Sequence, residues 1–153
     1  MSPQHRYYLI DSVIIYEVNE HIIRNVENSL STKLLTTASA CLTTLLNQKG
    51  EVVSRKTLMH AGWEKHGFIV STNTLNQNVL LIRKAIAKIS EKEIIKTVFR
   101  QGISIPKGIH IIEFKDNAAL EAYLDAHNYP KQIASALTDT QDAEPLTAEI
   151  GRA

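Results

Sequence analysis

Apolar residues near the N-terminus occur in short runs that are rich in β-branched and aromatic side chains. Two pairs of turn-forming residues, Asp-Ser and Asn-Glu, separate the first three runs from one another. Runs of this composition at hairpin spacing predict strands that pair with their neighbours. The strands expected are 7–10, 13–18, 21–26 and a fourth near 33–35. Together they predict a small antiparallel sheet.

From Thr37 the apolar residues recur at intervals of three and four, which predicts a helix ending near Gly50, a residue suited to a C-terminal cap. A second short helix is expected over 54–62, beginning at an N-cap serine. The third and longest helix is expected over 71–89. Its core-facing stripe is Leu75, Val79, Ile82, Ile86 and Ile89.

The opposite face of this third helix carries no charge between Ser71 and Ile82. Its outward positions begin with amides and continue into cations. They are Asn73, Asn76, Gln77, Leu80 and Lys84, with Arg83 and Lys88 toward the end. An outward leucine is suited either to a thymine methyl group or to a protein interface, and Leu81 beside it raises the same choice.

Segments 94–99 and 103–112 predict two further strands, joined at Gly102, which supplies the positive φ of a tight hairpin. Pro106 and Gly108 interrupt the second strand, so it bends or ends there. A short helix over 116–127 is expected to follow.

The expected domain organisation is therefore a body of residues 1–113 and an acidic tail or linker, 114–153. The helix over 116–127 lies in this tail and either docks on the body or pairs with a partner.

The loop between the second and third helices carries three large apolar side chains, Trp63, Phe68 and Ile69. Packing over the core is the favoured interpretation, and a binding patch is the alternative. Cys41, the single cysteine, lies inside an apolar pattern and is expected to be a packed thiol.

Charge is distributed unevenly along the 153 residues, although the net charge is only +1. Residues 1–113 hold 14 Lys and Arg against 9 Asp and Glu, whereas residues 114–153 hold 3 against 7. A basic body with an acidic tail is one pattern that suggests a nucleic-acid partner, although a solvated surface gives it as well.

The residues that catalysis needs are not grouped in this sequence. The six histidines are scattered, one cysteine provides no zinc-finger spacing, and phosphate-binding glycine motifs are absent. We therefore expect no catalytic residue, metal or cofactor. No apolar run approaches the roughly 20 residues of a membrane span, so a cytoplasmic location is expected.

Two helices joined through a loop, followed by a hairpin with a cation at its tip, outline a winged helix-turn-helix. The segments GEVVSRKTLMHAGW (50–63), TLNQNVLLIRKAI (74–86) and IIKTVFRQGISI (94–105) resemble, in order and spacing, three signature segments of OmpR/ToxR-type transcriptional regulators. The resemblance is greatest to the ToxR and CadC branch. It implies an α+β fold with a four-stranded N-terminal sheet, three helices and a C-terminal β-hairpin wing.

This resemblance also implies roles for individual residues. The recognition helix would be 71–89, the wing 99–103, and the loop 63–70 would be the one that touches the transcription machinery in relatives. Base contacts fall on Asn73, Thr74, Asn76, Gln77 and Leu80. Contacts with the DNA backbone fall on Arg83, Lys84, Lys96, Thr97 and Arg100. The charges of Arg55 and Lys56 make these two residues further candidates for backbone contact.

The function expected is sequence-specific binding of double-stranded promoter DNA by a bacterial regulator, as a dimer or array on repeated sites. Asn and Gln can pair with adenine through two hydrogen bonds, so an uncharged helix start can read bases. RNA polymerase or a partner regulator are further candidate partners. Because ToxR-like relatives continue into a membrane helix, the chain would lie at the inner face of the membrane if it is a fragment. The alternative is a winged-helix interaction module that holds a partner regulator through Leu80, Leu81 and the tail helix.

Overall fold

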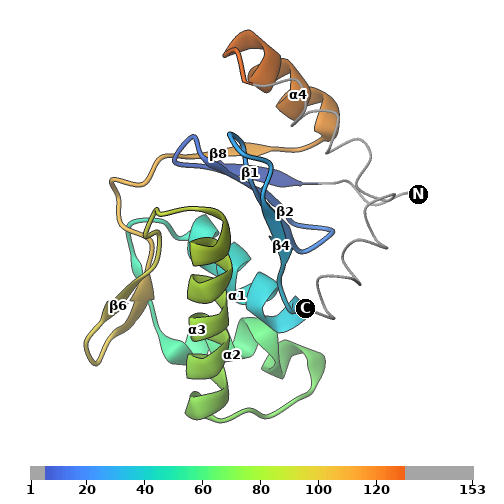
Figure 1. Ribbon diagram of the computed structural model, residues 1–153. Coiled ribbons are helices and arrows are strands. Elements are labelled where there is room, and N and C mark those ends of the chain that lie inside the picture. The colour runs from blue at the N-terminus through green and yellow to red at the C-terminus, as the bar shows by residue number, and fades with distance from the viewer. Residues whose placement is uncertain (1–5, 130–153) are drawn as a thin grey trace.

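A computed structural model describes residues 6–129, so the tail beyond Tyr129 lies outside the described residues. Strands and helices alternate in the mixed order of an α+β fold (Figure 1). The strands are β1 (Tyr7–Ile10), β2 (Ile14–Glu17), β3 (Ile22–Asn25), β4 (Ser31–Lys33), β5 (Val52–Val53), β6 (Lys96–Val98), β7 (Gly102–Ser104) and β8 (Ile111–Phe114). The helices are α1 (Thr36–Asn47), α2 (Arg55–Gly62), the 3-10 turn η1 (Glu64–His66), α3 (Thr72–Ile89) and α4 (Asn117–Ala126). Within 6–129, no helix combines the length and apolar composition needed to cross a bilayer.

The N-terminal strands form the expected antiparallel meander, and a fifth strand extends it. The order is β4-β3-β2-β1-β8, with Ile10 opposite Ile111 at one end of the added pair. The second wing strand ends at Ser104, close to the interruption expected at Pro106, and the rest of segment 103–112 contributes to β8 instead of returning to the wing. Pro106 has no N–H to donate, so pairing with the wing ends there and the chain crosses to the edge of β1.

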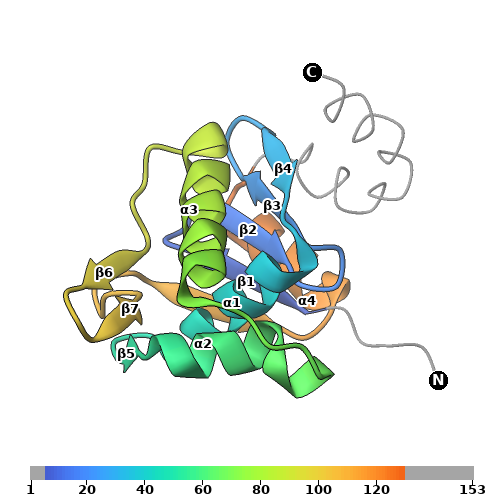
Figure 2. The same cartoon turned by 90° about the horizontal axis from the view of Figure 1, so that it is seen from below.

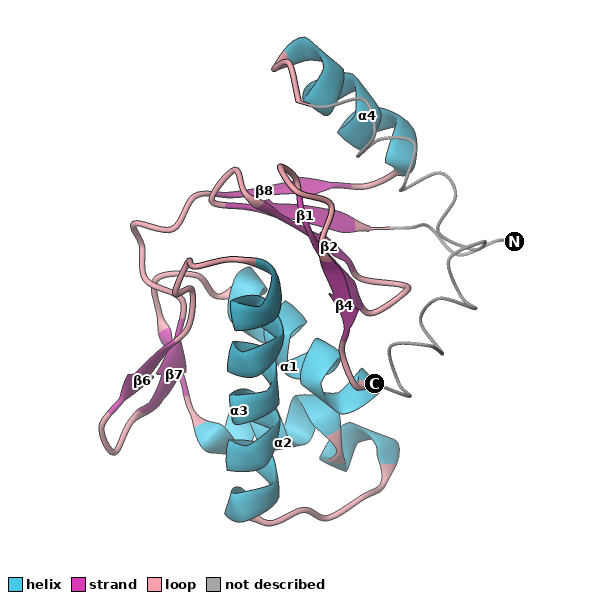
Figure 3. Ribbon diagram, viewed as in Figure 1, coloured by secondary structure: helices cyan, strands magenta, loops and turns pink. Residues whose placement is uncertain are grey.

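Helices cover both faces of this five-stranded sheet (Figure 3). One face packs on α1 and α3 and forms the main core, in which Tyr16, Leu45, Leu75 and Ile82 are fully buried. On the other face, α4 covers a smaller apolar cluster. Its members are Tyr7, Leu9, Ile15, Val26, Phe114, Leu120 and Leu124. The tail helix thus docks on the body, and the 113/114 division falls inside β8.

Both helices of the helix-turn-helix begin at the serines that the sequence indicates. The Ser54 hydroxyl accepts the Thr57 N–H and the Ser71 hydroxyl accepts the Thr74 N–H, each at 3.1 Å. These caps satisfy backbone donors that the first turn of a helix leaves open. Asp116 caps α4 in the same way, accepting the Ala119 N–H at 2.8 Å.

The wing is a small sheet of its own, in the order β5-β7-β6. Strand β5 precedes α2 and was not anticipated, because two residues are too short a run to show a period. Gly102 has φ +149, and a Cβ atom there would lie 2.1 Å from the Val53 carbonyl oxygen. Only glycine therefore allows β5 to approach β7 so closely. Figures 1 and 2 both place this wing beside α3.

The loop between α2 and α3 only partly follows expectation. Trp63 packs against the main core, but Phe68 is 65% exposed and Ile69 is 97% exposed. The expected packing of these two residues over the core is wrong, because Gly67 has φ +89 and the chain turns outward after η1. Cys41 is a buried free thiol as expected, and burial raises its pKa to about 11.

Candidate nucleic-acid interface

The exposed face of α3 presents uncharged polar groups over its first turns. Asn73, Asn76 and Gln77 are exposed, and Leu80 is 48% exposed. Thr74 is half-buried, and its hydroxyl lies 3.1 Å from that of the capping Ser71. The Thr74 side chain is thus engaged in the helix cap, whereas the amides point away from the core.

A buried amide on the same helix, Asn78, helps to hold α3 on α1, and no sequence pattern singles it out. Asn78 accepts a hydrogen bond from the Thr37 hydroxyl at 2.7 Å and donates to the Thr74 carbonyl at 3.2 Å. Its position interrupts no apolar stripe, so periodicity alone does not mark it. The contact helps to fix the rotation of α3 about its axis, and hence which residues face outward.

Arg55, the first residue of α2, reaches across to α3. Its Nε donates a hydrogen bond to Asn76 Oδ1 at 3.1 Å. A cation expected at the DNA backbone and an amide expected at the bases thus lie in direct contact. Lys56, its neighbour, is exposed.

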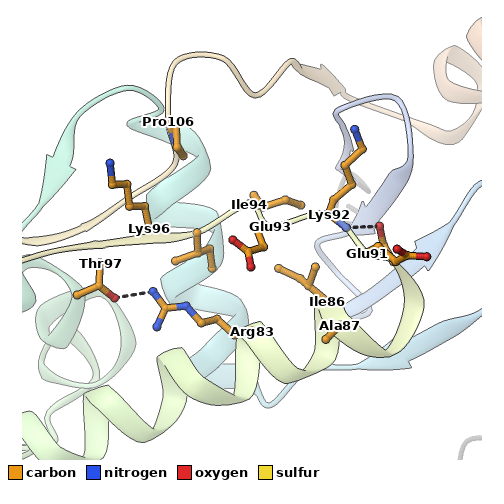
Figure 4. A pocket seen from close by; sticks show the side chains of 12 residues that line it. Arg83, Ile86, Ala87, Glu91, Lys92, Glu93, Ile94, Lys96, Thr97 and Pro106 are labelled. Atoms are coloured by element: carbon orange, nitrogen blue, oxygen red, sulfur yellow. Dashed lines mark hydrogen bonds between the residues drawn. The ribbon is translucent and has the colours of Figure 1, made fainter.

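On another side of α3, the helix contacts the wing. The Arg83 guanidinium donates to the Thr97 hydroxyl at 2.5 Å (Figure 4). These two residues and Lys96 line an open groove of about 870 Å³ with an apolar floor that includes Ile86 and Ile94. Three of the expected backbone contacts therefore come together where α3 meets β6.

The wing tip carries an exposed aromatic residue beside its cation. Phe99 is 79% exposed, and the Arg100 guanidinium carbon lies 5.1 Å from the centre of its ring. Arg100 itself has φ +62. The aromatic ring was not singled out from the sequence, although an aromatic residue directly before the turn cation was visible there.

Lys84 lies apart from these groups. With Leu81 it lines a groove between α3 and the segment that joins β4 to α1, which includes Leu35. Leu81 is 42% exposed, so both adjacent leucines of α3 reach solvent. The structure thus does not bring Lys84 to the wing side with Arg83.

The expected cations are available to a ligand. Within residues 6–129, none of Arg55, Lys56, Arg83, Lys84, Lys96 and Arg100 takes part in an ion pair. Over the same residues, no group of three or more His, Cys, Asp and Glu side chains is arranged to hold a metal ion. Cations without an ion-pair partner surround an uncharged polar helix start. This arrangement suits a nucleic acid, whose phosphates attract cations and whose base edges are read by hydrogen bonds.

Two capped helices joined by a loop and followed by a β-hairpin make this a winged helix-turn-helix protein. The family model described as "Transcriptional regulatory protein, C terminal" matches residues 29–105. The chain belongs to this family, which is the OmpR/ToxR type that the sequence resembled, and these residues form its DNA-binding domain. Its fold and family are those of DNA-binding regulators rather than of enzymes, and they do not favour the interaction-module alternative.

A curated protein is similar to most of this chain. The uncharacterized protein YqeI of Escherichia coli (strain K12) is 32% identical over 130 residues, which are 83% of this chain and 48% of YqeI. The chain thus spans about half the length of that relative.

Solved structures show the same fold. The DNA-binding domain of Escherichia coli CadC has a TM-score of 0.58 at 21% identity, over 66% of this chain and 91% of that one. The DNA-binding domain of the response regulator AdeR, solved in complex with an intercistronic region, has a TM-score of 0.51 at 16% identity, over 60% and 92%.

Proposed function

We propose that this chain regulates transcription by binding specific sequences in double-stranded promoter DNA. In this proposal α3 enters the major groove, Asn73, Asn76, Gln77 and Leu80 approach the base edges, and the wing lies on the backbone. The observation that carries it is the exposed uncharged start of α3 with unpaired cations around it. A major groove admits one helix, and amides there can distinguish base pairs.

Affinity in this arrangement comes mainly from the cations. Arg83, Lys96 and Thr97 meet at the junction of α3 and the wing, so they are suited to phosphates that pass between the two. Arg100 at the wing tip extends the contact along the strand, and Lys56 and Lys84 add cations on α2 and on the other flank of α3. Each phosphate neutralised steepens the dependence of binding on salt.

Mobility shifts with promoter fragments test this proposal. Combined Asn76→Ala and Gln77→Ala substitutions are expected to lower affinity for the preferred fragment by at least about tenfold and to leave binding to unrelated DNA nearly unchanged. Lys115→Ala is the control, since Lys115 lies between β8 and α4 in the chain, and α4 covers the face of the sheet opposite to α3 (Figure 1). Equal binding of wild type to every fragment would contradict sequence-specific recognition.

We also propose the finer points of partnership and location. Phe68 and Ile69 form an exposed apolar pair in the loop that touches the transcription machinery in relatives, so RNA polymerase is the partner proposed for it. The protein would bind repeated sites in pairs, in the cytoplasm or, if anchored, at the inner face of the membrane. Phe68→Ser with Ile69→Ser is expected to keep DNA binding and lose activation in transcription with purified polymerase. Unchanged activation would contradict the polymerase contact.

A further inference from the structure

The contact between α2 and α3 determines which way the Asn76 amide faces. Arg55 Nε lies 3.1 Å from Asn76 Oδ1. A guanidinium only donates hydrogen bonds, so the atom that it contacts must be the amide oxygen and not the nitrogen. The usual ambiguity between the two ends of an asparagine amide is therefore removed by chemistry.

The remaining polar atoms of this pair are all donors. Asn76 Nδ2 carries two N–H groups, and no hydrogen bond from them occurs within residues 6–129. Arg55 uses only Nε in the contact, so the four N–H groups of its two terminal nitrogens stay available. Asn76 Oδ1 keeps a second lone pair, but a donor that approaches it also meets the N–H groups of Arg55. Asn76 and Arg55 together therefore present mainly donors, where an isolated asparagine would present a donor and an acceptor equally.

Pairing with adenine through two hydrogen bonds needs both ends of the amide. The oxygen must accept from N6 while the nitrogen donates to N7. With Oδ1 turned toward Arg55, an adenine N6 amino group would approach the N–H groups of a guanidinium. Guanine instead offers two acceptors, N7 and O6, on the same edge.

We propose that Arg55 and Asn76 act as one reading unit that selects guanine, with Arg55 as the residue that sets the specificity of Asn76. This inference rests on the proposed function, because it needs α3 in the major groove. It changes two sequence-based expectations. Asn76 would not read adenine, and Arg55 would do more than neutralise a phosphate. Gln77, whose side chain has no hydrogen bond within residues 6–129, keeps both ends of its amide free for adenine.

Selection from a randomised duplex library tests the inference. Comparison of wild type with Asn76→Ala identifies the operator position that Asn76 reads, and guanine is the base expected there. Arg55→Ala is then expected to move the preference at this one position from guanine toward adenine. The expected change in the guanine-to-adenine ratio is roughly five- to a hundredfold, with the other positions unchanged.

Two further variants distinguish an effect on the orientation of the Asn76 amide from the loss of a positive charge and from a folding defect. Lys56→Ala removes the neighbouring exposed cation, and it is expected to weaken binding to all sequences alike without changing any base preference. Arg55→Lys keeps a charged donor for Asn76 Oδ1, so it is expected to retain guanine. Thermal unfolding of each variant checks that the fold is intact.

The inference is overturned if Arg55→Ala behaves as Lys56→Ala does, with lower affinity and unchanged preference for guanine. It is also overturned if the wild type selects adenine at the Asn76 position, or if Asn76→Ala alters no position. A wild-type protein that enriches no sequence at all contradicts the proposed function itself. The two failures are thus distinguishable from the same data.

Discussion

Arg83 on α3 donates a hydrogen bond to the hydroxyl of Thr97 on β6, which links the recognition helix to the wing through their side chains. The two residues are 14 positions apart, with the turn after α3 between them. One phosphate lying at this junction would meet both groups. In the proposed complex, the position of α3 relative to the wing would therefore affect binding, as would the charges themselves.

Arg83→Ala is expected to weaken DNA binding about tenfold and to reduce the slope of log affinity against log salt by about 1, because one phosphate contact is lost. Thr97→Val removes the hydroxyl but no charge, so it is expected to weaken binding while leaving the slope unchanged. Titrations at several salt concentrations measure both quantities. Equal slopes for wild type and Arg83→Ala would show that Arg83 does not contact a phosphate.

Core and interface positions on α3 are expected to respond in opposite ways. Leu75 is fully buried, so Leu75→Ala should lower the free energy of unfolding by about 2 to 5 kcal/mol. Gln77 is exposed, so Gln77→Ala should change stability by less than about 0.5 kcal/mol and still reduce specific binding. Urea denaturation and mobility shifts give the two readouts. A destabilised Gln77→Ala would argue against its assignment to the interface.

Gly102→Ala is expected to disrupt the wing, since the added Cβ would meet the Val53 carbonyl oxygen at 2.1 Å. A loss of at least about 3 kcal/mol of stability is expected, because β5 and β7 must separate. Gly67→Ala is the matched control. Gly67 also has a positive φ, +89, but nothing lies within 4 Å of its Cβ position, so only the backbone cost of about 1 to 2 kcal/mol applies. Similar losses in the two variants would contradict the proposed close contact.

Cys41 is expected to make stability fall with rising pH. Burial raises the pKa of its thiol from 9.0 to about 11, so above pH 9 the unfolded chain releases a proton that the folded chain retains. The stability of the folded chain is therefore unaffected by ionisation of this thiol well below pH 9. By pH 10 it has fallen by about 1 kcal/mol. Cys41→Ala should lack this fall in stability with pH, so the difference in stability between wild type and Cys41→Ala should shrink between pH 8 and pH 10. A constant difference would mean that the thiol is not protected.

Removal of α4 is expected to destabilise the body, which tests the division of the chain at residue 113. A chain ending there would lose Phe114, Leu120 and Leu124, and would expose Leu9 and Ile15 on the sheet. Each buried side chain of this size is worth about 1.5 to 3 kcal/mol, so a loss of at least about 3 kcal/mol is expected. A chain ending at residue 129 is the control. Equal stability of the two chains would support 1–113 as a self-sufficient domain.

Much of the fold was predictable because its signals are local. The stripe from Leu75 to Ile89 repeats with the helical period, and it is buried as expected. Ser54, Ser71 and Asp116 act on backbone groups three residues away, so the sequence indicates each of these caps directly. The family resemblance additionally predicted which hairpin is the wing and which helix is the recognition helix.

The misassigned elements depend on distant partners. Strand β8 pairs with β1 from about 100 positions away, and nothing within 111–114 distinguishes that pairing from one with the wing. Phe68 and Ile69 were expected to pack, but the path of the loop after Gly67 leaves them in solvent. Apolar composition predicts a tendency to be buried, whereas exposure depends on the direction that the chain takes.

The sequence by itself determined the two faces of α3, because side-chain direction along a helix follows from its period of 3.6 residues. It therefore placed the amides of Asn76 and Gln77 outward. Only the tertiary structure decided that Arg55 meets Asn76 and that Arg83 meets Thr97. These contacts depend on how α2, α3 and the wing pack on the shared core, and packing brings together residues that no local pattern relates.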